Sequence, residues 1–269
     1  MASRRSPVAR TVDGHVTRKR FGQNFLADPH YVARIAAAVA PQPGEIVVEI
    51  GPGLGALTGE LIARAGRIVA VEIDRDLAAR LRERFGPDQL ELVVGDALRF
   101  DFASLGRGLR VVGNLPYNIS SPLLFHLAAQ ADALRDLTVM LQREVVARMT
   151  ASPATADYGR LTVMLQATFA IERLFIVPPG AFRPVPKVES AVARLVPLRE
   201  ARPRIADPAR FERVVAAAFA QRRKTLRNAL ATLVSPDAFA AAGIDPQRRG
   251  ETLSVHEFVA LAEAAGAPA

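Results

Sequence analysis

The chain has 269 residues, 50% of them hydrophobic, and its 35 lysines and arginines exceed its 27 acidic residues to give a formal net charge of +8. It contains no cysteine, which excludes disulfides, thiolate nucleophiles and cysteine-ligated metal centres. The four histidines are scattered without the spacing of metal ligands, so we expect no metal site. No apolar run approaches the roughly 20 residues that span a bilayer, and the first residues lack the apolar segment of a secretory signal. We therefore expect a cytoplasmic protein that does not contact a membrane.

Basic residues are concentrated at the beginning of the chain. Within the first 22 positions Asp13 is the only acid, against Arg4, Arg5, Arg10, Arg18, Lys19 and Arg20. Residues 1–18 have no periodic hydrophobic pattern, so we expect a flexible basic arm. Such arms neutralise phosphates and release counterions, which indicates a nucleic-acid partner. A solvated tail without a partner is the alternative.

A cofactor loop is predicted in the first third of the chain. Residues 47–50 form a short, apolar, β-branched run, as expected of a parallel strand covered on both faces, and helical spacing follows over 57–65. The alternating glycines from Gly51 to Gly55 let the backbone turn and approach a ligand without a Cβ in the way. Glu72 ends the next strand-like run, where a carboxylate can accept hydrogen bonds from ribose hydroxyls. The same pattern fits a nicotinamide dinucleotide site, so the cofactor class stays open at this point.

Strands and helices alternate along the following residues. Further strands are predicted over 67–73, 90–96, 109–113 and 137–142, and helices over 29–40, 76–85, 122–130 and 143–150. Asp96 and Asn114 stand, like Glu72, at the carboxyl ends of strands, which is the edge where open α/β sheets bind ligands. Two consecutive strand patterns, 168–177 and 188–196, have no helix between them and indicate an antiparallel hairpin at the sheet edge.

The last part of the chain is predicted to be helical. Residues 197–208 carry three prolines, as an interdomain linker would. Apolar residues then recur on one helical face from Phe211 to Leu233, and a shorter helix is predicted over 255–265. Beside that face stand four cations without an acid among them: Arg222, Arg223, Lys224 and Arg227. We expect them to bind RNA phosphates, with a solvated helix surface as the alternative.

The decisive motif, Asn114-Leu115-Pro116-Tyr117, follows the fourth strand and suits the amino group of a planar base. The amino nitrogen of adenine is conjugated with its ring and is a poor nucleophile. An Asn oxygen and the carbonyl of Leu115 can both accept its hydrogens and direct its lone pair at a methyl donor. Pro116 fixes its own backbone φ, and Tyr117 offers a stacking face worth roughly 1 to 3 kcal/mol.

These motifs resemble one known family. Residues 114–117 are similar to the fourth motif of amino-directed adenine methyltransferases, and Glu49-x-Gly51-x-Gly53-x-Gly55 is similar to their S-adenosylmethionine loop. Further matches are Gly22-Gln23-Asn24-Phe25-Leu26, Phe182-x-Pro184-x-Pro186-Lys187-Val188-x-Ser190 and Gln221-Arg222-Arg223-Lys224-Thr225-Leu226-Arg227-Asn228. From about Lys19 to Phe258 the chain resembles the ribosomal RNA small subunit methyltransferase A family, the dimethyltransferases of 16S ribosomal RNA.

The resemblance implies a fold, a cofactor and a role for each matched residue. The implied fold is an α/β, Rossmann-like methyltransferase sheet with an antiparallel edge hairpin over residues 19–200, plus a small all-helical RNA-binding domain over 201–269. The implied cofactor, S-adenosylmethionine, would lie against Asn24, Leu26, Gly51, Glu72, Asp96 and Asn114. Tyr117 and Phe182 would sandwich the target base beside the other residues of the Asn114 motif. Without the family match, Phe182 would be a plug at the end of the hairpin.

The implied reaction is methylation at N6 of two adjacent adenosines in the 3′-terminal hairpin loop of 16S rRNA, giving N6,N6-dimethyladenosines. The implied partner is that RNA within the small (30S) subunit or its precursor, and we expect a monomer that also serves as a late assembly checkpoint.

Three other functions remain open. A 23S rRNA adenine methyltransferase of the macrolide-resistance type shares the sheet and the loop, but the matches over 182–190 and 221–228 favour the 16S enzyme. A DNA adenine methyltransferase would need a larger target-recognition domain than the residues after the linker provide. A non-catalytic ribosome-assembly factor is the alternative from a different class.

Overall fold

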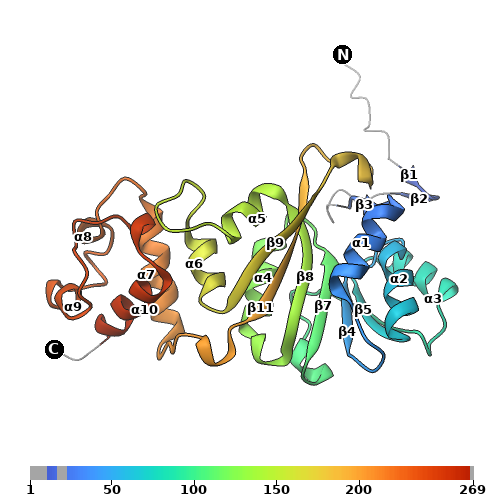
Figure 1. Ribbon diagram of the computed structural model, residues 1–269, viewed down its shortest axis with the longest axis horizontal. Coiled ribbons are helices and arrows are strands. Elements are labelled where there is room, and N and C mark those ends of the chain that lie inside the picture. Colours follow the sequence, from blue (N-terminus) through green and yellow to red (C-terminus); the bar gives the residue numbers. More distant parts are fainter. Residues whose placement is uncertain (1–10, 17–22, 267–269) are drawn as a thin grey trace, which may run out of the picture. The chain divides into compact units, whose positions relative to one another are not determined.

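The computed structural model describes residues 11–16 and 23–266, and the chain divides into two compact units (Figure 1). Unit 1 comprises residues 1–123, 133–143 and 174–194, whereas unit 2 comprises 124–132, 144–173 and 195–269. Residues 1–10 and 17–18 of the predicted basic arm lie outside the described residues, and so do Gly22 and the cations Arg4, Arg5, Arg10, Arg18, Lys19 and Arg20. Residues 11–16 of that arm are described and differ from the prediction. They form two short paired strands, β1 (Thr11–Val12) and β2 (His15–Val16).

The sheet has seven strands in the order β6-β5-β4-β7-β8-β11-β9. These strands are β4 (Val47–Ile50), β5 (Ile68–Glu72), β6 (Leu90–Val94), β7 (Leu109–Asn114), β8 (Leu134–Gln142), β9 (Phe169–Val177) and β11 (Ser190–Pro197). β4 pairs in parallel with β5 on one side and with β7 on the other, so that Val48 faces both Val69 and Val111. The strand order therefore reverses beside β4, and an open α/β sheet binds its ligand at such a reversal.

The edge of the sheet is antiparallel, as the sequence predicts. β11 and β9 are neighbours, and the backbone N–H of Leu198, just after β11, donates to the carbonyl of Thr168, just before β9, at 3.0 Å. The end of one strand thus lies beside the beginning of the other. A separate antiparallel pair joins β3 (Phe25–Leu26) to β10 (Phe182–Arg183), with Leu26 opposite Phe182.

Ten α-helices are described in residues 11–16 and 23–266. They are α1 (Pro29–Val39), α2 (Ala56–Ala65), α3 (Arg75–Arg84), α4 (Ser120–Ala129), α5 (Arg143–Met149), α6 (Arg160–Gln166), α7 (Pro208–Ala220), α8 (Leu226–Ala229), α9 (Pro236–Ala241) and α10 (Val255–Ala264). The predicted start of α1 is confirmed, because the Asp28 carboxylate accepts a hydrogen bond from the N–H of His30 at 2.9 Å and Pro29 is the first helical residue. In the described part of the chain, no helix has both the length and the apolar character needed to cross a membrane.

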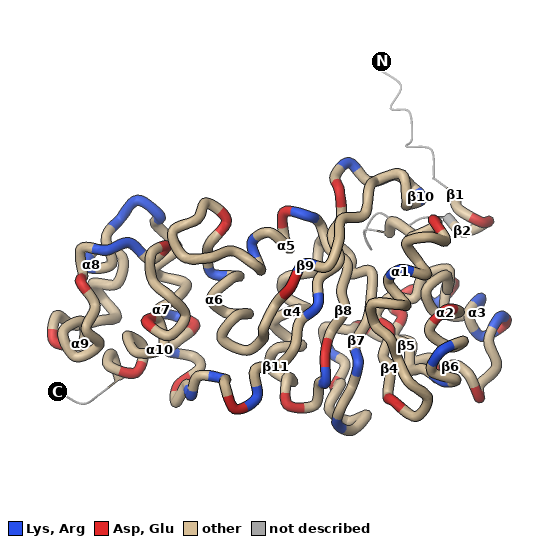
Figure 2. Tube along the Cα trace, viewed as in Figure 1, with Lys and Arg blue, Asp and Glu red and all other residues tan. Residues whose placement is uncertain are grey.

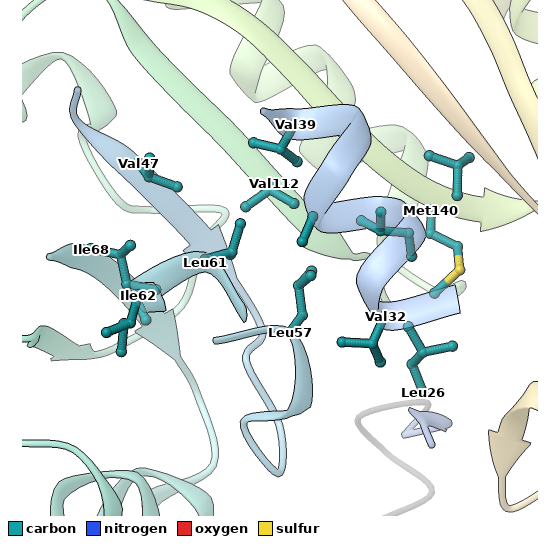
Figure 3. Close-up of a cluster of buried hydrophobic side chains, with 14 of the residues drawn as sticks. Leu26, Val32, Val39, Val47, Leu57, Leu61, Ile62, Ile68, Val112 and Met140 are labelled. Carbon is teal, nitrogen blue, oxygen red and sulfur yellow. The ribbon is translucent and has the colours of Figure 1, made fainter. Parts of the chain in front are cut away.

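Helices α1 and α2 bury their apolar faces against the strands of unit 1 (Figure 3). Val32 and Val39 of α1 meet Leu57 and Leu61 of α2 in one cluster of buried side chains, together with Val112 of β7. Full burial of each such side chain stabilises the fold by roughly 1.5 to 3 kcal/mol. This packing holds the glycine loop, which leads from β4 into α2, against a rigid support.

Unit 2 has its own apolar core, which the helices α6, α7, α8, α9 and α10 share. The sequence predicts one helical face from Phe211 to Leu233, but α7 ends at Ala220 and α8 begins only at Leu226. Leu226 still faces the same core as Phe211, so the turn between the helices keeps the apolar spacing that suggested a single helix. The core also takes Val163 from α6, and unit 2 includes residues 144–173, which precede the predicted boundary at residue 200.

Candidate active site at the carboxyl ends of the strands

A cavity of about 270 Å³ opens in unit 1 at the carboxyl ends of β4, β5 and β7 and beside the end of β6. Its wall includes Gln23, Asn24, Phe25, Gly51, Gly53, Glu72, Asp96, Asn114, Leu115, Pro116 and Tyr117. Most of the residues that the sequence singles out for the cofactor and the target base therefore lie around one space. Leu26 lines a smaller neighbouring cavity of about 40 Å³, which it shares with Gly51 and Asn114.

The glycine loop needs glycine for two separate reasons. Gly51 and Gly53 have φ angles of +66° and +60°, in the left-handed region that side chains disfavour. A Cβ on Gly53 would come within 2.9 Å of the Phe25 ring, so that position also lacks space. A Cβ on Gly51 would meet no protein atom within 4 Å, although Gly51 lines the cavity. The Gly51 position thus opens on the space where a ligand would lie.

Glu72 is a buried carboxylate in the cavity wall, with 5% of its surface exposed. One carboxylate oxygen accepts a hydrogen bond from the N–H of Gly53 at 3.1 Å, and the other accepts one from the N–H of Asp74 at 2.9 Å. Burial raises the pKa of Glu72, and these two backbone hydrogen bonds oppose the rise. Each oxygen has a second lone pair, so the carboxylate can accept ligand hydroxyls as well.

Glu49 lies in β4, just before the glycine loop, and is 2% exposed. Its carboxylate accepts a hydrogen bond from the Thr58 hydroxyl at 2.6 Å, which ties the end of β4 to the first turn of α2. Burial raises the pKa of Glu49 to about 7, and the charge of Glu72 acts in the same direction. The sequence match includes Glu49 but does not indicate this altered pKa.

Asp96 caps a turn and also lies in the cavity wall. Its carboxylate accepts a hydrogen bond from the N–H of Leu98 at 2.9 Å and so caps the turn after β6. It also lines the cavity, next to Ala97 and Leu98. A positive charge or a hydrogen-bond donor on a ligand could bind this carboxylate, with the apolar side chains of Ala97 and Leu98 beside it.

The side chain of Asn114 has a defined orientation. Its Nδ2 donates to the backbone carbonyl of Asn24 at 2.8 Å. A carbonyl only accepts, so the amide nitrogen must be the atom that faces Asn24, and the Oδ1 atom is turned away from it. Asn114 lines the cavity, so this hydrogen bond fixes the orientation of an amide in the cavity wall.

Tyr117 is held by a residue that the sequence did not assign to the site. Its phenol oxygen lies 2.7 Å from the hydroxyl of Ser190, which is fully buried at the start of β11. Burial raises the pKa of Tyr117, and the hydrogen bond with Ser190 partly offsets that rise. Ser190 ends the matched segment 182–190, and that match was the available signal for its role.

Phe182 is buried: its side chain is 0% exposed and belongs to the apolar core of unit 1. It pairs with Leu26 across β10 and β3. Stacking of its ring on the target base opposite Tyr117 stays a prediction, and so does the alternative, a plug at the end of the hairpin.

Several apolar residues of the cavity wall escaped the sequence analysis. Ile73, directly after Glu72, is 45% exposed although it is large and apolar, and it lines the cavity together with Leu98 and Ile119. These three side chains give the cavity an apolar part beside the Glu72 carboxylate. The position next to the strand-end carboxylate was the only sequence signal for it.

The predicted RNA-binding cations lie in unit 2, where Figure 2 shows basic residues between α7 and α8. Arg222, Arg223 and Lys224 are exposed in the turn after α7, and Arg227 is exposed on α8. The sequence predicts that the four cations lie beside one helical face, but in the structure they are divided between a turn and α8. The Arg222 guanidinium donates to the carbonyl of Ala156 at 2.9 Å, so it also anchors a neighbouring loop.

Sequence comparisons agree with the chemistry of this site. The model of the ribosomal RNA adenine dimethylase family matches residues 14–266. A protein of Aromatoleum aromaticum named ribosomal RNA small subunit methyltransferase A is 61% identical over 92% of this chain and 93% of its own length. A protein of the same name from Thiobacillus denitrificans is also 61% identical, over 92% of this chain and 97% of its own length.

Solved structures give the same picture. A dimethyladenosine transferase from Plasmodium falciparum is similar with a TM-score of 0.78 and 25% identity, over 88% of this chain and 95% of that one. The 23S rRNA methyltransferase ErmE is similar with a TM-score of 0.67 and 31% identity, over 90% of this chain and 99% of that one. With its methyltransferase sheet and an orientated Asn114 in the cavity, the chain belongs to the ribosomal RNA adenine dimethylase family.

Proposed function

We propose that the chain transfers methyl groups from S-adenosylmethionine to N6 of two adjacent adenosines in the 3′-terminal hairpin loop of 16S rRNA, giving N6,N6-dimethyladenosines. Membership of the family makes the chain a ribosomal RNA methyltransferase. Relatives named for the small subunit reach 61% identity, whereas the 23S enzyme ErmE reaches 31%, and this difference supports the 16S substrate over the 23S alternative.

The cavity suits S-adenosylmethionine. We assign the ribose hydroxyls to Glu72, the adenine amino group to Asp96, and the methionine end to Asn24, with Gly51 against the cofactor. The open space over Gly51 and the buried carboxylate of Glu72 support this assignment. When bound, S-adenosylmethionine supplies a methyl group on a positively charged sulfur.

The observation that carries the proposal is the hydrogen bond from Asn114 to the carbonyl of Asn24. It fixes the amide of Asn114 in the wall of the cavity, and in this proposal its Oδ1 atom faces the target base as an acceptor. An N6 hydrogen of adenine bound to that acceptor would orient the amino group, and the Leu115 carbonyl would accept the second hydrogen. Fixing an acceptor before the reaction removes the cost of ordering it during the reaction.

The remaining residues of the motif would shape the base site. Tyr117 offers its ring as a stacking platform, and its hydrogen bond with Ser190 limits the rotation of that ring. Pro116 has a fixed φ and keeps the Leu115 carbonyl in place. Leu115 and Ile119 give this part of the cavity wall an apolar surface. The amino group becomes acidic once it is alkylated, so its proton can leave to solvent without a strong base.

We assign binding of the RNA phosphates to the exposed cations Arg222, Arg223, Lys224 and Arg227 of unit 2. In this proposal the substrate is the RNA within the 30S subunit or its precursor, and the chain acts in the cytoplasm as a monomer. Binding to incomplete subunits until the methyl groups are added would make it a late assembly checkpoint.

Transfer of labelled methyl groups from S-adenosylmethionine tests the proposal. The substrates are small subunits from a strain that lacks this modification, with free 16S RNA and 23S RNA alongside, and the control protein is Asn114→Ala. We expect four methyl groups per subunit, confined to dimethyladenosine, and at least a 100-fold lower rate with Asn114→Ala, as for loss of one preorganised hydrogen-bonding group.

Other outcomes would revise the function in defined ways. Label in 23S RNA alone would favour the resistance type of enzyme. Tight binding to subunits without any transfer of label would favour a non-catalytic assembly factor. An Asn114→Ala protein that still binds subunits would show that the checkpoint role is separable from methylation.

A further inference from the structure

A short hairpin, formed by β1 and β2, is tied to the rest of unit 1 by side-chain contacts. Its turn contains Asp13 and Gly14, with φ angles of +47° and +71°, as in the tight turns that join two strands. An isolated two-stranded hairpin is marginally stable at best in water, and this one pairs only two residues on each strand. Its stability must therefore come from contacts with the rest of unit 1.

Arg80 of α3 holds the turn from one side. Its guanidinium donates to the carbonyl of Asp13 at 2.8 Å and to the carbonyl of Gly14 at 2.9 Å. A planar guanidinium that binds two neighbouring carbonyls fixes both the position and the tilt of the turn. The hairpin is thereby fastened to the helix that begins just after Glu72 and Asp74.

His15 fastens the hairpin from the other side, and its side chain is 4% exposed. Its Nε2 atom lies 3.4 Å from the side-chain oxygen of Gln23 and 3.7 Å from the carboxylate of Asp74. The edge of the imidazole also meets the ring of Phe25, with ring centres 5.9 Å apart. These three contacts fix the position of the imidazole between the hairpin and the rest of unit 1.

All three partners of His15 belong to the cofactor site or support it. Gln23 and Phe25 line the cavity. The Gln23 side chain donates to the Asp74 carboxylate at 3.0 Å, and the N–H of Asp74 donates to Glu72 at 2.9 Å. The hairpin therefore connects through a short series of contacts to the carboxylate that we assign to the ribose.

We propose that His15 is a positioning residue of the cofactor site and that the hairpin of residues 11–16 sets the affinity for the cofactor. This inference rests on the proposed function for the identity of the ligand. His15 supports the wall formed by Gln23 and Phe25, whereas the acceptor of the target amino group is Asn114. Loss of the imidazole should therefore weaken cofactor binding and leave the rate at saturating cofactor nearly unchanged.

Calorimetric titration of the full-length protein with S-adenosylhomocysteine, without RNA, measures this affinity independently of catalysis. We expect a Kd about 10-fold higher for His15→Ala and for Arg80→Ala than for the wild type. Arg82→Ala removes an exposed arginine of the same helix and should leave the Kd unchanged. His15→Gln keeps a hydrogen-bond donor toward Gln23 and should restore part of the lost affinity.

Steady-state kinetics give a second measurement. The KM for S-adenosylmethionine should rise about 10-fold in His15→Ala while kcat stays within twofold of the wild type. Wild-type affinity in both His15→Ala and Arg80→Ala, or an equal loss in Arg82→Ala, would overturn the inference. If His15→Ala does not fold, Arg80→Ala decides alone, because it removes the same fastening without changing a core residue. A wild-type protein that fails to bind S-adenosylhomocysteine would instead count against the proposed function.

Discussion

The phenol oxygen of Tyr117 lies 2.7 Å from the hydroxyl oxygen of Ser190, and this hydrogen bond joins the motif after β7 to the first residue of β11. Tyr117 is half-buried in the cavity wall, whereas Ser190 is fully buried and cannot contact a substrate itself. The position of the stacking platform is thus set by a residue that lies outside the cavity.

Removal of either partner of this hydrogen bond should slow methyl transfer by the same amount. A hydrogen bond of this kind contributes about 1 kcal/mol, so Ser190→Ala and Tyr117→Phe should each lower kcat by about 2- to 10-fold. The double variant should be no slower than either single variant, because both changes remove the same interaction. Mass analysis of the methylated nucleosides gives the rates and the ratio of monomethyl to dimethyl product.

Ser104→Ala is the matched control, since its hydroxyl also makes a hydrogen bond, to the carbonyl of Asp101 at 2.6 Å, but in an exposed turn. It should leave the rate unchanged. Additive losses in the double variant would mean that Ser190 does not act through Tyr117.

Gly51→Ala should separate the strain of the backbone from the loss of space for a ligand. The new Cβ would occupy a left-handed position, which lowers the free energy of unfolding by roughly 1 to 2 kcal/mol, and it would point into open space in the cavity. Gly108→Ala introduces the same kind of strain, at φ +77°, with no atom within 4 Å and outside the cavity wall. Urea unfolding should show similar losses for both variants, while titration with S-adenosylhomocysteine should show weaker binding for Gly51→Ala alone. Equal affinities would place the cofactor elsewhere.

The stability of the protein should depend on the ionisation of Glu49. Its pKa is raised from 4.5 to about 7 in the folded state, chiefly by burial, so the folded state holds this proton more tightly than the unfolded state does. The stabilisation from the bound proton is complete below pH 4.5 and is lost as the pH rises through about 7. Over that range the free energy of unfolding should fall by up to about 3 kcal/mol relative to Glu49→Gln, which cannot ionise.

Urea unfolding of both proteins at several pH values from 4.5 to 8 checks this prediction. The difference between their free energies of unfolding should change with pH in the stated direction. Parallel curves for the wild type and Glu49→Gln would show that the carboxyl group has the same pKa in the folded and unfolded states.

The exposed cations between α7 and α8 should govern the salt dependence of RNA binding. Arg223→Gln and Lys224→Gln should each weaken binding to the small subunit and reduce the slope of log K against log salt by about 1. Binding isotherms at several salt concentrations measure that slope. Arg82→Gln, on α3 of unit 1, is the control and should leave it unchanged. An unchanged slope in the unit 2 variants would remove them from the RNA interface.

The parallel sheet and much of the cavity could be predicted because their signals are local. Strands β4 and β5 are apolar on both faces, and Gly51, Glu72 and Asn114 stand directly at strand ends, so topology alone brings them to one edge of the sheet. Their arrangement follows from the order of the strands.

What the sequence did not predict depends on contacts between distant or very short segments. Phe182 is buried on a two-residue strand that pairs with Leu26, and a pairing so short leaves no hydrophobic period to detect. His15 is buried beside Asp74, which lies just before α3, while Arg80 of α3 holds the turn that precedes His15. The turn after Ala220 went unnoticed because the apolar spacing continues across it into Leu226.

The pairing of β3 with β10 has a consequence for the order in which the site is completed. β3 directly follows Asn24, and it is held by Phe182 and Arg183, residues synthesised long after β4, β5 and β7. During synthesis the glycine loop and Asn114 are therefore made well before β10. β10 is the strand that pairs with β3, next to the Asn24 carbonyl that accepts the hydrogen bond from Asn114. The nascent protein acquires a finished cofactor wall only when most of unit 1 has left the ribosome.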